Sequence, residues 1–314
     1  MQVSATALSR ELEGASKATR AELTVILPAK NEATTLDQIL PRLKAQFPEA
    51  EIMVVDDAST DETGQIASTH AARLVTHPYC MGNGAAVKTG ARSATGNLLV
   101  FMDADGQHDP EDVSRLLAKI DEGYDMAVGA RCSADHAGAH RGIANAVFNR
   151  LASWMVNHKV EDLTSGFRAV RADKFRRFLY LLPNAFSYPT TITMSFFRAG
   201  FRVAYVPVSM PRRNGRSHIR PLRDGVRFLL IIIKIGTLYS PLKLFLPVSA
   251  AFFALGLAYY AYTYFTSYRF TNMSALLFVA SILVFLIGIV SEQISALMYR
   301  DSDVRRGDEP DLKK

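Results

Sequence analysis

Two long apolar stretches near the end of the chain restrict its fold more than any other feature of the sequence. They cover residues 242–265 and 274–299, and the second becomes polar at Glu292 and Gln293. About 20 apolar residues are enough for a helix to cross the hydrocarbon layer of a bilayer. A buried helical pair in a water-soluble core is the alternative, but stretches of this length exceed ordinary core helices. The sequence therefore predicts a transmembrane helical hairpin over residues 241–300.

Basic residues flank this hairpin unevenly, and their distribution predicts its orientation. Eight Lys or Arg residues lie between Arg212 and Lys243, five lie in residues 299–314, and only Arg269 lies in the connecting loop. Because basic segments stay preferentially on the cytoplasmic side, we expect both termini in the cytoplasm and the connecting loop outside. Residues 214–240 are expected to form a juxtamembrane segment with an amphipathic helix that lies on the bilayer.

The charge of the chain favours a membrane partner over a nucleic acid. The net charge is +6, and basic residues gather just before the hairpin, where they would attract anionic lipids, and occur again in the predicted cytoplasmic tail, residues 301–314. We find no platform of interleaved basic and aromatic residues, so we expect no nucleic-acid partner. Cys80 and Cys132 are not spaced as metal ligands. Residues 1–21 are polar and lack the apolar core of a signal peptide, so we expect a mobile leader before a cytoplasmic domain.

Residues 22–213 alternate between strand-like and helix-like stretches. The run "LTVILPA" from Leu23 to Ala29 is continuously apolar, as expected for a strand covered on both faces. The next stretch, "EATTLDQILPRLKAQF", has the apolar spacing of a helix that Pro41 must kink or divide. The alternation continues to "YDMAVGAR". It predicts an α/β domain with a mainly parallel sheet and helices on both faces.

Three polar clusters follow predicted strands, at the points where those strands end. They are Pro28 to Glu32, Asp56 with Asp57, and Asp103 to Gln107. Ligands of open parallel sheets bind beyond the carboxyl ends of the strands. The three clusters therefore predict a single binding site.

The third cluster contains two aspartates one residue apart, at the end of the apolar run in "LLVFMDADGQHDP". A carboxylate at the end of such a run is costly unless a positive charge meets it. Asp103 and Asp105 can face one divalent cation, because Mg²⁺ and Mn²⁺ take oxygen ligands and keep room for water and phosphate. Gln107 can add a neutral oxygen. His108 could be a further ligand, but an exposed histidine or one that lies behind the ligands is favoured. Asp109 is expected to cap the next helix.

Six motifs together resemble one family. In order along the chain they are "VILPAKNEATTL", "VVDDASTDET", "DADGQ", "GAR", "DLTSGFR" and "RRNGRS". Their order and spacing resemble those of family 2 glycosyltransferases with the Rossmann-like GT-A fold. The sequence is most similar to the dolichyl- or polyprenyl-phosphate sugar synthases that carry a C-terminal two-helix membrane hairpin. The resemblance extends from about Leu23 to Ser217.

The resemblance implies roles for individual residues. Those that contact the nucleotide sugar would be Pro28, Lys30, Glu32, Val55, Asp57 and Asp103. The metal ligands would be Asp103, Asp105 and Gln107, and the catalytic residues would be Asp105, Arg131 and Arg168. Those that bind the acceptor phosphate would be Arg131, Arg141, Ser165, Arg213 and Ser217. The implied cofactor is Mg²⁺ or Mn²⁺, the donor is a GDP- or UDP-linked sugar, and the acceptor is a polyprenyl phosphate.

The residues also favour a phosphate acceptor on chemical grounds. A phosphate monoester has a second pKa of about 6, so it is already ionised near neutral pH and needs no general base. It needs cations that hold two anions together, and arginine does this without losing its charge. We therefore expect in-line attack of a lipid phosphate on the anomeric carbon of the sugar, with inversion and electrostatic stabilisation.

The sequence departs from the family pattern in three places. The stretch "PYCMGNGAAVKTGA" lacks the lysine usual beside its first glycines, and Lys88 follows a helical turn later. Residues 186–200 lack a glutamate that relatives often carry, so donor selection is expected to differ. His218 stands where a lysine often follows the serine, which would add a pH dependence near neutrality if it touches the acceptor phosphate.

Other functions stay open to different degrees. A transferase that acts on a lipid or protein hydroxyl would need a carboxylate base, for which Asp162 is the candidate. A processive polysaccharide synthase is disfavoured, because the only tryptophan, Trp154, lies outside a Q-x-x-R-W element. A non-catalytic module that binds lipid or partner subunits is disfavoured by the intact acidic and arginine motifs. The donor sugar, the nucleotide base, the metal preference, the lipid length and the oligomeric state, a homo-oligomer included, stay open.

Overall fold

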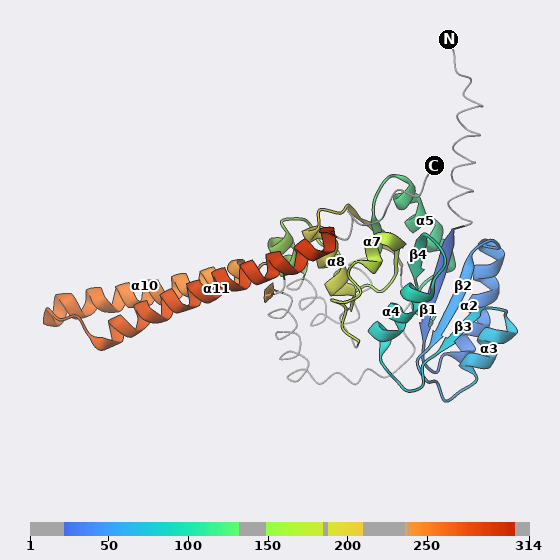
Figure 1. Ribbon diagram of the computed structural model, residues 1–314, viewed down its shortest axis with the longest axis horizontal. Helices are drawn as coiled ribbons and strands as arrows, with labels where there is room; N and C mark the ends of the chain where they lie inside the picture. The colour runs from blue at the N-terminus through green and yellow to red at the C-terminus, as the bar shows by residue number, and fades with distance from the viewer. Residues whose placement is uncertain (1–21, 132–148, 185–187, 210–235, 238, 305–314) are drawn as a thin grey trace, which may run out of the picture. The chain divides into compact units, whose positions relative to one another are not determined.

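The computed structural model of the chain describes residues 22–131, 149–184, 188–209, 236–237 and 239–304 (Figure 1). The chain divides into two compact units. The first contains Met1–Ala152 with His158–Arg216, and the second contains Ser153–Asn157 with Ser217–Lys314. A short segment from the middle of the sequence therefore belongs with the C-terminal helices.

The first unit contains a seven-stranded sheet with the order β3-β2-β1-β4-β6-β5-β7. Its strands are β1 (Leu23–Ala29), β2 (Glu51–Asp56), β3 (Arg73–Thr76), β4 (Leu98–Phe101), β5 (Met126–Arg131), β6 (Arg168–Arg171) and β7 (Val203–Val208). Only β6 among these strands runs antiparallel to its neighbours, β4 and β5. The prediction of a mainly parallel sheet is confirmed.

Helices connect and cover these strands (Figure 1). They are α2 (Ala33–Gln46), α3 (Thr63–Thr69), α4 (Asn83–Ser93), α5 (Pro110–Asp121), α7 (Ala172–Arg176) and α8 (Tyr188–Arg198). Pro41 lies inside α2 without dividing it. The apolar stripe of α2 explains this, because Leu36 and Leu43 are buried on either side of the proline and hold both halves on the core.

Helix α4 packs very closely on the sheet. A methyl group placed on Gly90 would lie 2.4 Å from Cγ2 of Ile26 in β1, so only glycine allows this approach. A methyl group at the same position would lie 3.4 Å from Cγ2 of Val55 in β2, so the helix packs over both strands. As predicted for a covered parallel strand, β1 is buried along almost its whole length.

The second unit contains two long apolar helices, α10 (Pro241–Ser267) and α11 (Asn272–Val304). Both are long and apolar enough to cross a membrane, and most of their surface is exposed. They lie side by side (Figure 1), and the Ser249 hydroxyl donates a 2.9 Å hydrogen bond to the Ser281 carbonyl across the pair. The predicted pair of long C-terminal helices is confirmed. The leader, most of the juxtamembrane segment and the end of the tail lie outside the described residues.

Candidate active site

Three loops meet at one edge of the sheet, where β1, β2 and β4 end. Ala29 is in register with Asp56, and Ile26 is in register with Phe101. The Asp57 N–H donates a 2.9 Å hydrogen bond to the Ala29 carbonyl, which extends the pairing into the loops. The three polar clusters predicted from the sequence therefore follow neighbouring strands.

The first loop is fixed by hydrogen bonds to the second. Asn31 has a φ of 56°, a conformation that asparagine tolerates better than most residues. Its side-chain oxygen accepts a 2.8 Å hydrogen bond from the Thr60 N–H, and its own N–H donates to Ser59. The Glu32 N–H donates to Thr63 Oγ1. Lys30 lies exposed at the start of this loop.

Asp57 is buried and fully engaged. Oδ1 accepts hydrogen bonds from His77 Nδ1 at 2.8 Å and the Met81 N–H at 2.7 Å, and Oδ2 accepts from the Gly82 N–H and the Cys80 thiol. Burial alone would raise the pKa of Asp57, but these hydrogen bonds lower it to about 2. The Asp57 carboxylate therefore holds the loop before α4, and its contact with a nucleotide base stays a prediction.

Val55 is buried beside this edge of the sheet, whereas Lys30 is exposed there. The Val55 side chain is fully buried and faces Gly90 of α4, so only its backbone could reach a ligand. Lys30 instead contacts the exposed Cys80, and this hydrogen bond, opposed in part by desolvation, raises the pKa of the lysine. Lys30 is thus a charged and accessible cation at the predicted donor site.

Asp103 and Asp105 lie in the turn that follows β4. Burial raises the pKa of Asp103, and His108 and an Asn83 side-chain hydrogen bond oppose that shift. Asp105 Oδ1 accepts a 3.2 Å hydrogen bond from the Gln107 N–H, which shapes the turn. Asp103 is half-buried and forms no ion pair with a described residue, although the charge of the buried Arg168 also acts on it.

His108 lies behind this turn. It is buried, its ring stacks on Phe167 with 4.7 Å between centroids, and its Nδ1 accepts a 3.3 Å hydrogen bond from the Asp103 N–H. Burial lowers the pKa of His108. Of the alternatives open to His108, which also included a ligand and an exposed histidine, the structure shows the one behind the aspartates.

These aspartates fit the divalent cation that their pattern predicts. Among the described residues no cluster of three or more His, Cys, Asp or Glu side chains gathers to hold a metal. Mg²⁺ and Mn²⁺ do not require one, because they bind through one or two carboxylates and complete their shell with water and substrate phosphate. Asp103 and Asp105 supply hard oxygen donors, and Gln107 is near enough in the chain to add another.

Arg131 ends β5 and is paired with Asp162. Its Nε donates to Asp162 Oδ2 at 2.8 Å, its Nη2 donates to Asp162 Oδ1 at 3.1 Å, and Nη2 also donates to Thr164. The same carboxylate accepts hydrogen bonds from the N–H groups of Arg131, Thr164 and Ser165. Burial would raise the pKa of Asp162, but the Arg131 pair and the other donors lower it.

Arg168 is completely buried in β6. Its guanidinium donates to the carbonyls of Ser165 and Pro189 and to Thr193 Oγ1. All three acceptors are neutral, and burial lowers its pKa. Arg168 therefore stabilises the Ser165–Gly166 turn from inside the protein. Its side chain is 0% exposed, so no part of it is accessible to a substrate.

The glycine-rich stretch brings one residue to the site that was not predicted. Asn83, the first residue of α4, hydrogen-bonds to Asp103. Lys88 points elsewhere, because its ammonium donates to the Leu182 carbonyl and to Asn184. The place of Asn83 between two glycines at the start of a helix is the signal that could have identified it.

The remaining predicted residues are placed as follows. Ser165 is buried and its hydroxyl has no hydrogen-bond partner among the described residues. Pro28 is half-buried at the end of β1. Arg141, Arg213, Ser217 and His218 lie outside the described residues.

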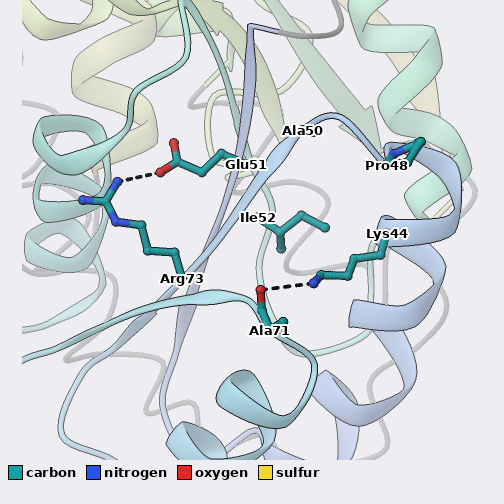
Figure 2. A pocket seen from close by; sticks show the side chains of 7 residues that line it. All are labelled: Lys44, Pro48, Ala50, Glu51, Ile52, Ala71 and Arg73. Carbon is teal, nitrogen blue, oxygen red and sulfur yellow. Dashed lines mark hydrogen bonds and ion pairs between the residues drawn. The ribbon is translucent and has the colours of Figure 1, made fainter.

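A pocket lies at the opposite edge of the sheet, where β2 and β3 begin (Figure 2). It has a volume of about 440 Å³ and is lined by Lys44, Pro48, Ala50, Glu51, Ile52, Ala71 and Arg73. Its cations are engaged, since Arg73 pairs with Glu51 and Lys44 Nζ donates to the Ala71 carbonyl at 3.1 Å (Figure 2). It takes no part in the candidate active site.

Comparison with known proteins connects this geometry to a family. The model of "Glycosyl transferase family 2" matches residues 24–179. The undecaprenyl-phosphate mannosyltransferase of Micrococcus luteus is 32% identical over 206 residues, which are 60% of this chain and 83% of that protein. This chain belongs to glycosyl transferase family 2. The family predicted from the motifs is thus confirmed.

Other similarities extend to the helices and the fold. The model of the "GtrB C-terminal hairpin" matches residues 240–297 of this family 2 glycosyltransferase. The polyprenol monophosphomannose synthase of Mycolicibacterium smegmatis is 29% identical, with 60% of this chain and 77% of that protein covered. The structure of glucosyl-3-phosphoglycerate synthase from Mycobacterium tuberculosis with Mn²⁺ and UDP is similar with a TM-score of 0.56. Its sequence identity is 23%, with 70% of this chain and 80% of that chain covered, so it supports the GT-A fold.

Proposed function

We propose that this family 2 glycosyltransferase moves a hexose from a nucleotide sugar to a polyprenyl phosphate at the cytoplasmic face of a membrane. Two of the similar proteins are named for mannose and polyprenyl phosphate chemistry. The C-terminal hairpin supports a lipid acceptor, because it would hold the enzyme where that acceptor is found. The Asp103–Asp105 turn supports a diphosphate donor.

The hydrogen bonds and the lowered pKa of Asp162 favour a phosphate acceptor over a hydroxyl acceptor. A hydroxyl acceptor needs a base, and Asp162 was the candidate from the sequence. Its carboxylate already accepts hydrogen bonds from Arg131, Thr164 and Ser165 and has a lowered pKa, so it is a weak base with no oxygen to spare. A phosphate acceptor needs no base, because it is ionised near neutral pH.

The reaction then balances without proton transfer from the acceptor. A phosphate oxygen of the lipid forms a bond to the anomeric carbon, and the bond from that carbon to the donor diphosphate breaks. The electron pair leaves with the nucleoside diphosphate, and attack from the opposite face inverts the anomeric centre. Arg131, whose side chain is 31% exposed, would hold the acceptor phosphate, because it is already oriented by Asp162.

Asp103, Asp105 and Gln107 would hold Mg²⁺ or Mn²⁺ in this proposal. When bound, the ion supplies positive charge that stabilises the departing diphosphate. The similarity to an enzyme crystallised with Mn²⁺ supports that assignment. Lys30 would contact the donor from the end of β1. Arg141, Arg213 and Ser217 are proposed to complete the acceptor site.

The test is a transfer assay with purified full-length protein. GDP- and UDP-linked hexoses are each incubated with polyprenyl phosphate or with the matching free polyprenol, in Mg²⁺, in Mn²⁺ or in EDTA. We expect a lipid-linked product with the phosphate acceptor, a divalent ion and one of the nucleotides. Product from the polyprenol alone would overturn the acceptor and favour a hydroxyl-directed transferase. Turnover of the phosphate acceptor in EDTA would contradict the proposed dependence on a divalent ion.

The membrane arrangement is part of the same proposal. We place the GT-A domain at residues 22–213, the interfacial segment at 214–240 and the hairpin at 241–300, with both termini cytoplasmic. Protease treatment of sealed, inside-out vesicles tests it. Loss of the C-terminal tail together with the catalytic domain is expected, and protection of either end contradicts the orientation.

A further inference from the structure

The only tryptophan of the chain lies in the second unit, far in sequence from the helices it contacts. Trp154 belongs to the helical residues 149–156, and residues Ser153–Asn157 form part of the unit that contains α10 and α11. The segment is packed there, because Met155 is buried and would lie 3.1 Å from a methyl group on Gly236. Its place beside α10 is therefore fixed by burial.

Lys243 joins this segment to the first turn of α10. Its ammonium donates hydrogen bonds to the Trp154 carbonyl at 3.1 Å, the Met155 carbonyl at 3.0 Å and Asn157 Oδ1 at 2.9 Å. Asn157 has a φ of 56° and follows the last helical residue, as a left-handed helix end does. The ammonium also lies 6.0 Å from the centre of the Trp154 ring.

Polar contacts gather at the same end of the hairpin. The Leu242 N–H donates to Glu292 Oε2 at 3.2 Å, and the Ser295 hydroxyl donates to the Thr237 carbonyl. With Lys243 these residues form a polar layer, which we call the hairpin base. The apolar part of both helices begins directly beyond it.

The other end of the hairpin carries exposed aromatic rings. Tyr262, Phe265, Tyr268 and Phe270 are all exposed there. Between Lys243 and Tyr264, α10 rises about 30 Å at about 1.5 Å per residue, which is the thickness of the hydrocarbon layer. Tryptophan and tyrosine concentrate at the two boundaries of that layer. The Trp154 side chain is 47% exposed, at the level of the hairpin base.

We propose that Trp154 and Lys243 form an anchor that lies in the headgroup layer of the membrane at the base of the hairpin. The partner of this surface is the lipid interface. The indole would lie among the carbonyl groups of the lipids, with its N–H hydrated and its rings against the acyl chains. The inference rests on the proposed function only in requiring that α10 and α11 cross the membrane.

The single tryptophan makes the depth measurable in the full-length protein. The protein is reconstituted into phosphatidylcholine vesicles whose acyl chains carry bromine either near the carbonyl end or near the chain terminus. We expect shallow bromine to quench the tryptophan fluorescence at least about twofold more than deep bromine, because indoles prefer the boundary. Trp154→Phe supplies the background.

A depth control uses the middle of α10. Phe253 is exposed on that helix, and Phe253→Trp on the Trp154→Phe background should be quenched more by deep bromine. Stronger deep than shallow quenching of Trp154 overturns the proposal, as does quenching by aqueous iodide alone.

Flotation of the same vesicles separates this inference from the proposed function. If the protein floats with the vesicles but its indole stays exposed to water, the anchor is disproved and the transferase proposal stays intact. Shallow quenching without glycosyl transfer supports the anchor and contradicts the proposed reaction. Failure to float overturns both.

Discussion

Gly166 lies directly against the carboxylate of Asp103, so that a methyl group placed on it would be 3.0 Å from Oδ2 and 3.1 Å from the Tyr188 hydroxyl. Gly166→Ala should therefore displace the aspartate and reduce glycosyl transfer at least about tenfold, since small misplacements at a reacting centre are costly. The measurement is kcat at saturating Mn²⁺. Gly64→Ala is the control, because its nearest neighbour is 3.5 Å away. Equal activity of both variants would refute the expectation.

Asp105→Asn should abolish most of the transfer activity. The variant keeps the size of the side chain but removes the negative charge of a carboxylate that we propose binds the metal. A loss of activity of about 100-fold or more is therefore expected. Its thermal midpoint should change little, because the described contact of Asp105 is one hydrogen bond from Gln107. Asp112→Asn, which breaks an exposed pair with Arg115, should leave transfer unchanged. A fully active Asp105→Asn would exclude this turn as the metal site.

The two lysines near the glycine-rich loop should behave differently. Lys30→Met should raise the KM for the nucleotide sugar about tenfold, because one charge-assisted contact to a phosphate is lost. Lys88→Met should leave this KM unchanged, since the Lys88 ammonium is held by Leu182 and Asn184. Donor titrations at saturating acceptor measure both. The opposite result would mean that Lys88 takes the place of the missing family lysine.

Arg168→Lys should act on turnover and not on acceptor affinity. A lysine cannot bridge Ser165, Pro189 and Thr193 together, so stability should fall by about 1–3 kcal/mol. The KM for polyprenyl phosphate should stay constant, because the guanidinium is buried. Arg176→Lys is matched, since Arg176 donates to the carbonyls of Ala91 and Ala94; it should lose stability with normal kcat. A raised acceptor KM in Arg168→Lys would show that the arginine touches the substrate.

Asp57 should make stability depend on pH in the acid range. Its pKa falls from 3.8 to about 2 on folding, so its stabilisation is complete above about pH 4 and is lost as the pH falls towards 2. The contribution of Asp57 to the free energy of unfolding that is lost in this range is about 2 kcal/mol. Thermal unfolding between these pH values, compared with Asp57→Asn, measures it. The variant should lack this share of the pH dependence, and parallel curves would contradict the assignment.

The strand ends and the Asp103–Asp105 turn could be predicted from the sequence, because they depend on local patterns. The apolar run before Asp103 placed the turn at a strand end, and the cap predicted at Asp109 is confirmed by its hydrogen bond from the Glu111 N–H. The apolar length of the C-terminal stretches likewise predicted α10 and α11.

The partners of the charged residues could not be predicted in this way. Arg131 and Asp162 meet because β6 turns back between β4 and β5. The burial of Arg168 depends on α8, which supplies neutral acceptors from a different part of the chain. Motifs indicate which side chains gather at a site, but the contacts among residues distant in sequence decide whether each one faces a ligand or supports its neighbours.

The late, antiparallel insertion of β6 has a consequence for synthesis of the chain. Until residue 171 has left the ribosome, β4 and β5 each lack a hydrogen-bonded neighbour in the finished sheet. Unpaired strand edges invite pairing with other chains. A nascent chain that stalls before residue 171 therefore exposes unpaired edges of β4 and β5, and the addition of β6 covers one edge of each strand.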